Sequence, residues 1–262
     1  MKFHESPDGV QYLTFDSLPA ERVIHGFFTR KGGVSPEPWS SLNTGGTVGD
    51  ERSHVIENRR RIFSALGRRV ESVFDVWQVH GVETRASRQP RPLDAPHEQA
   101  DIILTDSPNV TLFMRFADCV PIFLYDPVRH AAALAHAGWQ GTVKKAVAAA
   151  VAAMRTHYGC KPADLTAVIG PSIGPDHYAV GEDVIQQVRG TFEAGAEELL
   201  LGVDGKTHLD LWEANRLTLA EAGVGKIEIS RVCTACDVGL WFSHRAERGR
   251  TGRLGAILAL AD

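Results

Sequence analysis

This sequence lacks long apolar runs and has no excess of positive charge. Nowhere does the chain hold the roughly 18 consecutive apolar residues that suggest a transmembrane helix. Its first residues, MKFHESPDGV, contain no apolar signal segment, so we expect a cytoplasmic protein without a membrane partner. Lys and Arg number 28 against 32 Asp and Glu, a formal net charge of -4. The basic footprint of a nucleic-acid-binding protein is therefore missing.

Cysteine is also sparse. The four cysteines in 262 residues are too few for a disulfide framework, which serves small secreted domains with insufficient cores. Hydrophobic residues make up 44% and charged residues 23%, the balance of a folded globular protein. No internal repeat or low-complexity linker is present, and only the polar, proline-containing segment 86–99 reads as a longer loop. We predict one domain over residues 1–262, acting as a monomer.

Apolar spacing predicts strands and helices in mixed order. Helical spacing predicts helices at 51–67, 141–158, 181–195 and 209–223. Short apolar runs rich in β-favouring residues predict strands within 21–35, 73–81, 100–106, 110–126, 130–139, 165–175, 227–233 and 255–261. This order indicates a layered α/β or α+β domain.

Three metal-binding residue types stand at the ends of three of these predicted strands. His80 closes DVWQVHG, Cys119 closes FMRFADC and His136 closes the strand of LAHAGW. One cysteine with two histidines is a known catalytic zinc set that leaves a fourth position open. We therefore predict a zinc site on His80, Cys119 and His136, with Asp118 as a candidate for proton transfer.

The same residues allow a second chemistry. Cys119 is also a candidate thiolate nucleophile, with His136 or His80 as its base, and this mechanism needs no metal. The spacing is not specific, because 39 residues separate His80 from Cys119 and no compact ligand motif is present. The CxxC pair of Cys233 and Cys236 lacks a second CxxC, so we interpret these residues as buried or partly buried structural thiols.

Arginines near predicted turns are candidates for binding an anion such as phosphate. They are Arg30 in FFTRKGGVS, Arg59, and Arg245 and Arg253 in FSHRAERGRTGR. Arginine forks and exposed amides of glycine-rich loops suit phosphate oxygens. We select Arg30 and Arg245 as substrate-binding residues.

Taken together, the motifs of this chain resemble those of the YfiH family, also called multicopper polyphenol oxidase or laccase-domain proteins. The motifs are TRKGGVS, SLN, QVHG, ADCVPI, HAGWQGT, GPSIGP, YAVG, LDLWEANRLTL and SHRAERGRTGR, from about residue 25 to the C-terminus. The resemblance implies a layered α/β/β/α domain with mixed sheets, an α+β fold shared with a bacterial deamidating toxin. It also implies zinc on His80, Cys119 and His136.

The activity implied by the resemblance is phosphorolysis of purine nucleosides, namely adenosine, inosine, guanosine and methylthioadenosine, with additional adenosine deamination. The older oxidase name implies copper and phenols instead. Two other functions stay open: an amidase that edits peptidoglycan precursors through Cys119 and His136, and a metal-binding or partner-binding module without activity.

The sequence departs from the family pattern near the predicted site. Gln140 stands where the family commonly has arginine in HAGWRG, and His177, Tyr178 and Ala179 stand in place of the CYE of CYEVG. His244 replaces a frequent tyrosine. These changes concern substrate contacts rather than the three ligands, and His177 is a candidate additional ligand.

Overall fold

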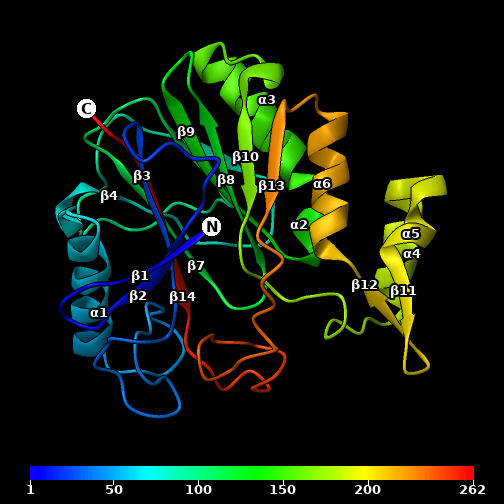
Figure 1. Cartoon of the computed structure of the whole chain (residues 1–262), viewed down its shortest axis with the longest axis horizontal. Helices are drawn as coiled ribbons and strands as arrows, with labels where there is room; N and C mark the ends of the chain where they lie inside the picture. Colours follow the sequence, from blue (N-terminus) through cyan, green and yellow to red (C-terminus); the bar gives the residue numbers. More distant parts are fainter.

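Strand β9 (Ala131–Ala137) explains the layered architecture, because all seven of its residues are buried. Ala132 and Leu134 point into one hydrophobic core, whereas Ala131, Ala133 and Ala135 point into another. Side chains alternate across a strand, so a strand buried on both faces must lie between two layers. The computed structural model, which describes residues 1–262, has β9 in such a position (Figure 1).

Two six-stranded sheets form the two inner layers. The first sheet has the order β1 (Lys2–Glu5), β2 (Gln11–Thr14), β3 (Val23–Phe28), β14 (Leu254–Leu260), β7 (Thr111–Phe116) and β4 (Val73–Phe74). The second has the order β13 (Lys226–Ile229), β10 (Thr166–Ile169), β8 (Val120–Asp126), β9, β6 (Ile102–Thr105) and β5 (Thr84–Ala86). Both sheets mix parallel and antiparallel pairs.

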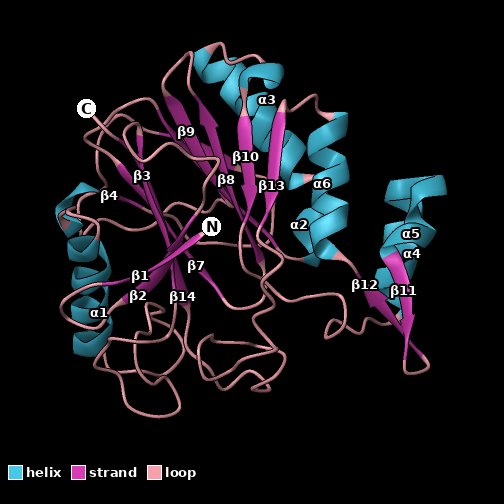
Figure 2. Ribbon diagram, viewed as in Figure 1, coloured by secondary structure: helices cyan, strands magenta, loops and turns pink.

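Helices cover the outer face of each sheet (Figure 2). Helix α1 (Arg52–Ala65) packs on the first sheet, where Ile62 and Phe63 contact a core that includes Phe113. The second sheet is covered by α2 (Trp139–Val143), α3 (Ala146–Tyr158) and α6 (Leu211–Glu221). Helices α4 (Glu182–Phe192) and α5 (Ala196–Leu199) extend beyond it with the hairpin of β11 (Leu200–Val203) and β12 (Lys206–Leu209). Short 3₁₀ turns occupy Val70–Ser72, Pro162–Asp164 and Glu193–Gly195.

The predicted fold class is confirmed: the chain has an α+β fold with α/β/β/α layers and mixed sheets. One core lies between the two sheets, a second between the second sheet and its helices, and a third beneath α1. None of the helices is long and apolar enough to cross a membrane.

Three element predictions need correction. Residues 110–126 form two strands in different sheets, β7 and β8, because the chain turns between them at Asp118, whose φ is 76°. The run 73–81 is a strand only at Val73–Phe74. The helix predicted at 141–158 breaks at Lys145, which has a φ of 56°. Strands β1, β2, β5, β11 and β12 were not predicted.

A buried carboxylate fastens the loop 86–99 to the first sheet. Asp75, which follows β4, is 1% exposed and accepts hydrogen bonds from Arg91 Nε at 2.8 Å and His97 Nε2 at 2.9 Å. Arg115 Nη1 lies 3.4 Å from the same carboxylate. Burial alone would raise the pKa of Asp75, but the hydrogen bond of His97 and the charges of Arg115 and Arg59 hold that pKa well below its usual range.

Replacing this carboxylate without changing its shape should destabilise the protein strongly. For Asp75→Asn we expect a loss of about 3–5 kcal/mol in the free energy of unfolding, because buried guanidinium groups lose their counter-charge. Urea denaturation at neutral pH measures the loss. Asp106→Asn, which breaks a pair with the exposed Arg88, is the control and should cost less than about 1 kcal/mol. Equal losses in the two variants would contradict this account.

Candidate metal centre

His80, Cys119 and His136 come together although they lie far apart in the sequence. One donor atom of each lies within 4.8 Å of the others, and Cys119 Sγ is 3.9 Å from His80 Nε2. His136 comes from β9, Cys119 from the connection between β7 and β8, and His80 from the loop after β4. We call these three residues the triad. His136 is buried, Cys119 is partly buried and His80 is exposed, so the triad is open to solvent on the His80 side.

Asp101, which sequence reasoning missed, organises two members of the triad. Its Oδ1 accepts a hydrogen bond from His136 Nδ1 at 2.8 Å and one from the backbone N–H of His80 at 3.0 Å. Its Oδ2 accepts from the N–H groups of Val79 at 3.1 Å and Gly81 at 2.7 Å. These bonds hold His80 at its φ of 61°, a left-handed conformation that few non-glycine residues adopt.

A sequence signal for Asp101 does exist. The residue directly precedes β6, and β6 pairs with β9 so that Ile102 lies opposite Ala135. An acidic side chain that opens a fully buried strand needs a partner, and His136 is the next residue along β9. Without knowledge of the β6–β9 register, the partner could not be identified.

The thiol and the buried imidazole favour each other's charged forms. Burial alone would raise the pKa of Cys119, but the charge and hydrogen bond of His136 and a hydrogen bond from His80 lower it to about 6. Burial would lower the pKa of His136, whereas the Cys119 charge and the Asp101 hydrogen bond raise it to about 9. At neutral pH the metal-free pair is a thiolate beside an imidazolium.

Gly138 lies directly beside the triad, and because it has no side chain it leaves room for the triad's side chains. A Cβ atom at this position would lie 2.8 Å from Cys119 Sγ and 3.2 Å from His80 Cδ2. Its φ of -73° is open to any residue, so the requirement for glycine here comes from space and not from backbone conformation.

Asp118 stands beside the thiol in the chain, but its carboxylate faces other groups. Oδ1 accepts a hydrogen bond from Thr234 Oγ1 at 2.7 Å, and Oδ2 accepts one from the backbone N–H of Arg245 at 2.6 Å. The Asp118 carbonyl accepts a third from the N–H of Ile173 at 3.0 Å. Asp118 therefore joins three segments next to Cys119, and its role in proton transfer stays a prediction.

The two selected arginines lie in different surroundings. The guanidinium of Arg30 is buried, donates to the Ser40 and Val238 carbonyls and pairs with Glu247 at 3.0 Å. These contacts engage it within the protein. Arg245 is exposed, and its guanidinium lies 4.7 Å from the centre of the Tyr178 ring. The charges of Cys119 and Asp118 also act on Arg253, whose pKa is lowered by burial. Arg245 and Arg253 are thus the arginines associated with the triad's surroundings.

Of the two CxxC cysteines, which were predicted to be buried or partly buried, only Cys236 differs from the prediction. Cys233 is partly buried, but Cys236 is exposed, and both are free. His177, a candidate additional ligand for the triad, instead has its Nδ1 within 3.7 Å of Cys233 Sγ and 3.6 Å of Cys236 Sγ. His177 therefore belongs to a separate group of side chains.

The donor set of the triad fits a transition metal. Thiolate and imidazole suit zinc and copper, and a carboxylate that accepts the remaining ring N–H of a histidine is the usual companion of such a ligand. Asp101 supplies this carboxylate to His136. His80, Cys119 and His136 would hold the ion and leave one position for another ligand.

The pair of thiolate and imidazolium predicts an unusual pH dependence for alkylation of Cys119 in metal-free protein. We expect the rate with iodoacetamide to be half-maximal at a pH of about 6, because the thiolate is the reactive form. His136→Gln removes the imidazolium and should move the midpoint above about 8.5, the ordinary thiol value. Mass spectrometry of the Cys119 peptide measures the rate. The exposed His157→Gln should leave the midpoint unchanged, and an ordinary midpoint in the wild type would refute the pair.

Asp101 should control how tightly the triad holds a metal. For Asp101→Asn we expect the Zn²⁺ concentration that half-protects Cys119 from iodoacetamide to rise by about 10- to 100-fold, the usual cost of losing a carboxylate behind a ligating histidine. Asp106→Asn, at the other end of β6, is the control and should bind as the wild type does. Unchanged protection in Asp101→Asn would show that the carboxylate is not needed.

Comparison with known proteins relates this chain and its fold to one family. Residues 24–261 match the family model described as multi-copper polyphenol oxidoreductase laccase. The chain is 36% identical over 250 residues to a purine nucleoside phosphorylase, YlmD, of Bacillus subtilis, covering 92% of this chain and 90% of that protein. It is 39% identical over 254 residues to a purine nucleoside phosphorylase of Deinococcus radiodurans, covering 95% of each.

Solved structures agree with the fold. YfiH of Bacillus licheniformis, a hypothetical protein, superposes with a TM-score of 0.90 at 35% identity, and 99% of each chain is covered. YlmD of Geobacillus stearothermophilus superposes with a TM-score of 0.91 at 34% identity, again over 99% of each chain. The resemblance predicted from the motifs is confirmed, and the chain belongs to the laccase-like YfiH family.

Proposed function

We propose that this chain is a zinc-dependent purine nucleoside phosphorylase that also deaminates adenosine. The observation that carries the proposal is the triad, in which two imidazoles and a thiolate meet beside an exposed face. The names of the relatives in Bacillus subtilis and Deinococcus radiodurans support the phosphorylase activity. A purine nucleoside and phosphate are the substrates that this function implies.

His80, Cys119 and His136 would hold the zinc ion, with Asp101 fixing the ring of His136. When bound, zinc would supply Lewis-acid polarisation of a substrate oxygen atom. Zinc is favoured over copper because one cysteine with two histidines is a known catalytic zinc set. Oxidation of phenols with oxygen normally needs several coppers, and a ligand set of two histidines and one cysteine does not supply them.

The arginines beside the triad suit the anionic substrate. The backbone N–H of Arg245 donates to the Asp118 carboxylate, and its Nη1 donates to the Ala179 carbonyl at 2.6 Å. Its guanidinium packs on the Tyr178 ring. Guanidinium groups held in a fixed orientation bind phosphate oxygens well, and Arg245 offers an exposed group whereas Arg253 offers a partly buried one. We assign phosphate to Arg245 and Arg253. Arg30, whose guanidinium bonds to Glu247 and two carbonyls, would act by holding the loops around this region.

Release of the base from a nucleoside should depend on phosphate and should require Cys119. In the reaction a phosphate oxygen bonds to C1′ of the ribose, the N-glycosidic bond breaks, and the base takes up a proton. Purified zinc-loaded protein with inosine should release hypoxanthine and ribose 1-phosphate only when phosphate is present. Cys119→Ser should lose this activity by at least about 100-fold, since a side chain that would bind the zinc ion is removed. Release of base without phosphate would contradict the proposal.

Deamination is tested in the same reaction mixture. Adenosine should yield inosine and ammonia, whether or not phosphate is added, because water is the co-substrate. Formation of adenine and ribose 1-phosphate with no ammonia would leave phosphorolysis and remove the deaminase assignment.

A second candidate, an amidase acting on peptidoglycan precursors, is favoured by one specific observation. Cys119, His136 and Asp101 form a thiol, imidazole and carboxylate series, which is the arrangement of cysteine hydrolases. This enzyme would work after complete removal of metal and would be inactivated by alkylation of Cys119. If metal-free protein cleaves a muramyl-peptide amide and no base is released from inosine, the amidase replaces the phosphorylase.

A further inference from the structure

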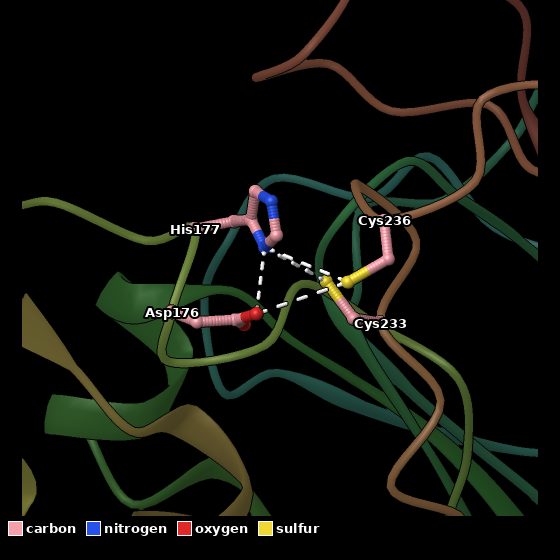
Figure 3. Close-up of side chains that lie close together, drawn as sticks. All are labelled: Asp176, His177, Cys233 and Cys236. Carbon is pink, nitrogen blue, oxygen red and sulfur yellow. Dashed lines mark hydrogen bonds and ion pairs between the residues drawn. The ribbon is translucent and has the colours of Figure 1, made fainter.

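Away from the triad, four side chains with metal-binding atoms converge on one point. Asp176, His177, Cys233 and Cys236 each offer one ligand atom, and these atoms all lie within 4.8 Å of one another. Figure 3 shows the four side chains pointing toward one another from two separate segments. We call these four residues the second cluster.

Parallel pairing of two strands brings these segments together. Strands β10 and β13 are parallel neighbours at the edge of the second sheet, so their carboxyl ends leave the sheet side by side. The pairing continues past both strands through a bridge between Ser172 and Cys233. One segment then supplies Asp176 and His177, and the other supplies Cys233 and Cys236.

Three donor–donor distances in the second cluster match the edges of a zinc tetrahedron, and a fourth, between Asp176 and His177, is slightly shorter. With Zn–S near 2.3 Å and Zn–N or Zn–O near 2.0–2.2 Å, tetrahedral donor atoms lie about 3.3–3.8 Å apart. His177 Nδ1 lies 3.7 Å from Cys233 Sγ and 3.6 Å from Cys236 Sγ. Asp176 Oδ2 lies 3.8 Å from Cys236 Sγ and 3.1 Å from His177 Nδ1.

The surroundings favour a thiolate ligand at Cys233. The backbone N–H of Gly174 points at Cys233 Sγ with a distance of 3.1 Å, a hydrogen bond that supports negative charge on sulfur. A Cβ at Gly174 would lie 2.7 Å from Asp176 Oδ1 and 3.1 Å from Cys233 Cβ, so the turn is closed tightly around the cluster.

We propose that Asp176, His177, Cys233 and Cys236 form a second zinc site, distinct from the triad and structural in role. Four protein ligands complete the tetrahedral coordination of a zinc ion, whereas the three ligands of the triad leave one coordination position open. The second site does not depend on the phosphorylase proposal. It offers no coordination position to a substrate.

The contacts around the second cluster show what such an ion stabilises. Thr234, between the two cysteines, donates its hydroxyl to Asp118, which is next to Cys119. Tyr178, next to His177, supports the guanidinium of Arg245. An ion at the second cluster would therefore fix the two segments on which Asp118 and Arg245 rest.

Metal stoichiometry tests the second site. Protein loaded with Zn²⁺ and dialysed should contain two zinc ions per chain by elemental analysis. Cys236→Ser and His177→Ala should each contain one, Cys119→Ser should contain one, and the double variant Cys119→Ser, Cys236→Ser should contain none. Cys160→Ala, which removes a buried thiol outside both groups, is the control and should keep two.

Cobalt substitution identifies the ligands by their absorption, and a check of the fold distinguishes loss of a ligand from misfolding of the variant. Cys119→Ser with Co²⁺ should still show thiolate-to-cobalt absorption, and this absorption should disappear in Cys119→Ser, His177→Ala although both CxxC thiols remain. Circular dichroism checks the fold of each variant. A wild type that holds one ion, lost only with Cys119→Ser, would overturn the proposal. A Cys233–Cys236 disulfide in protein purified without oxygen would overturn it as well.

Discussion

The carboxylate of Asp101 is the constraint on which the candidate site depends. It accepts one hydrogen bond from an imidazole and three from consecutive backbone amides, so it fixes His136 and the turn of His80 together. Because Asp101 begins a strand paired with β9, the strand register decides whether the carboxylate reaches His136. The register in turn follows from the cores on both faces of β9, where a shift of one residue would exchange their side chains.

Much of the fold could be predicted because its strongest signals are local. The helix expected at 51–67 was found as α1, since its apolar spacing and Gly67 are both visible in the sequence. The apolar run 110–126 was misread because continuous burial looks the same in one strand or in two strands of different sheets. Strands β1 and β2 escaped prediction because they are half exposed and carry little apolar alternation.

The residues of the triad could be predicted from the sequence, but the groups that support them could not. His80, Cys119 and His136 were selected by chemistry and by resemblance to a family, and the structure brings their donor atoms together. Asp101 was missed because all hydrogen bonds of its side chain reach 20 or more residues along the chain. Arg30 was selected because it lies at a glycine-rich turn, yet its guanidinium is buried and forms a long-range ion pair with Glu247. The CxxC pair lacked its partner in sequence, because Asp176 and His177 meet it only through the β10–β13 pairing.

The crossing of the chain from β7 to β8 has a mechanical consequence. Cys119 lies in the short connection between these strands, which belong to different sheets, whereas His136 belongs to the second sheet alone. Any sliding of one sheet over the other would displace the sulfur relative to the imidazole. The tightly interlocked side chains between the sheets, Phe116, Phe123 and Leu134 among them, resist such shear and so keep the reactive atoms in alignment.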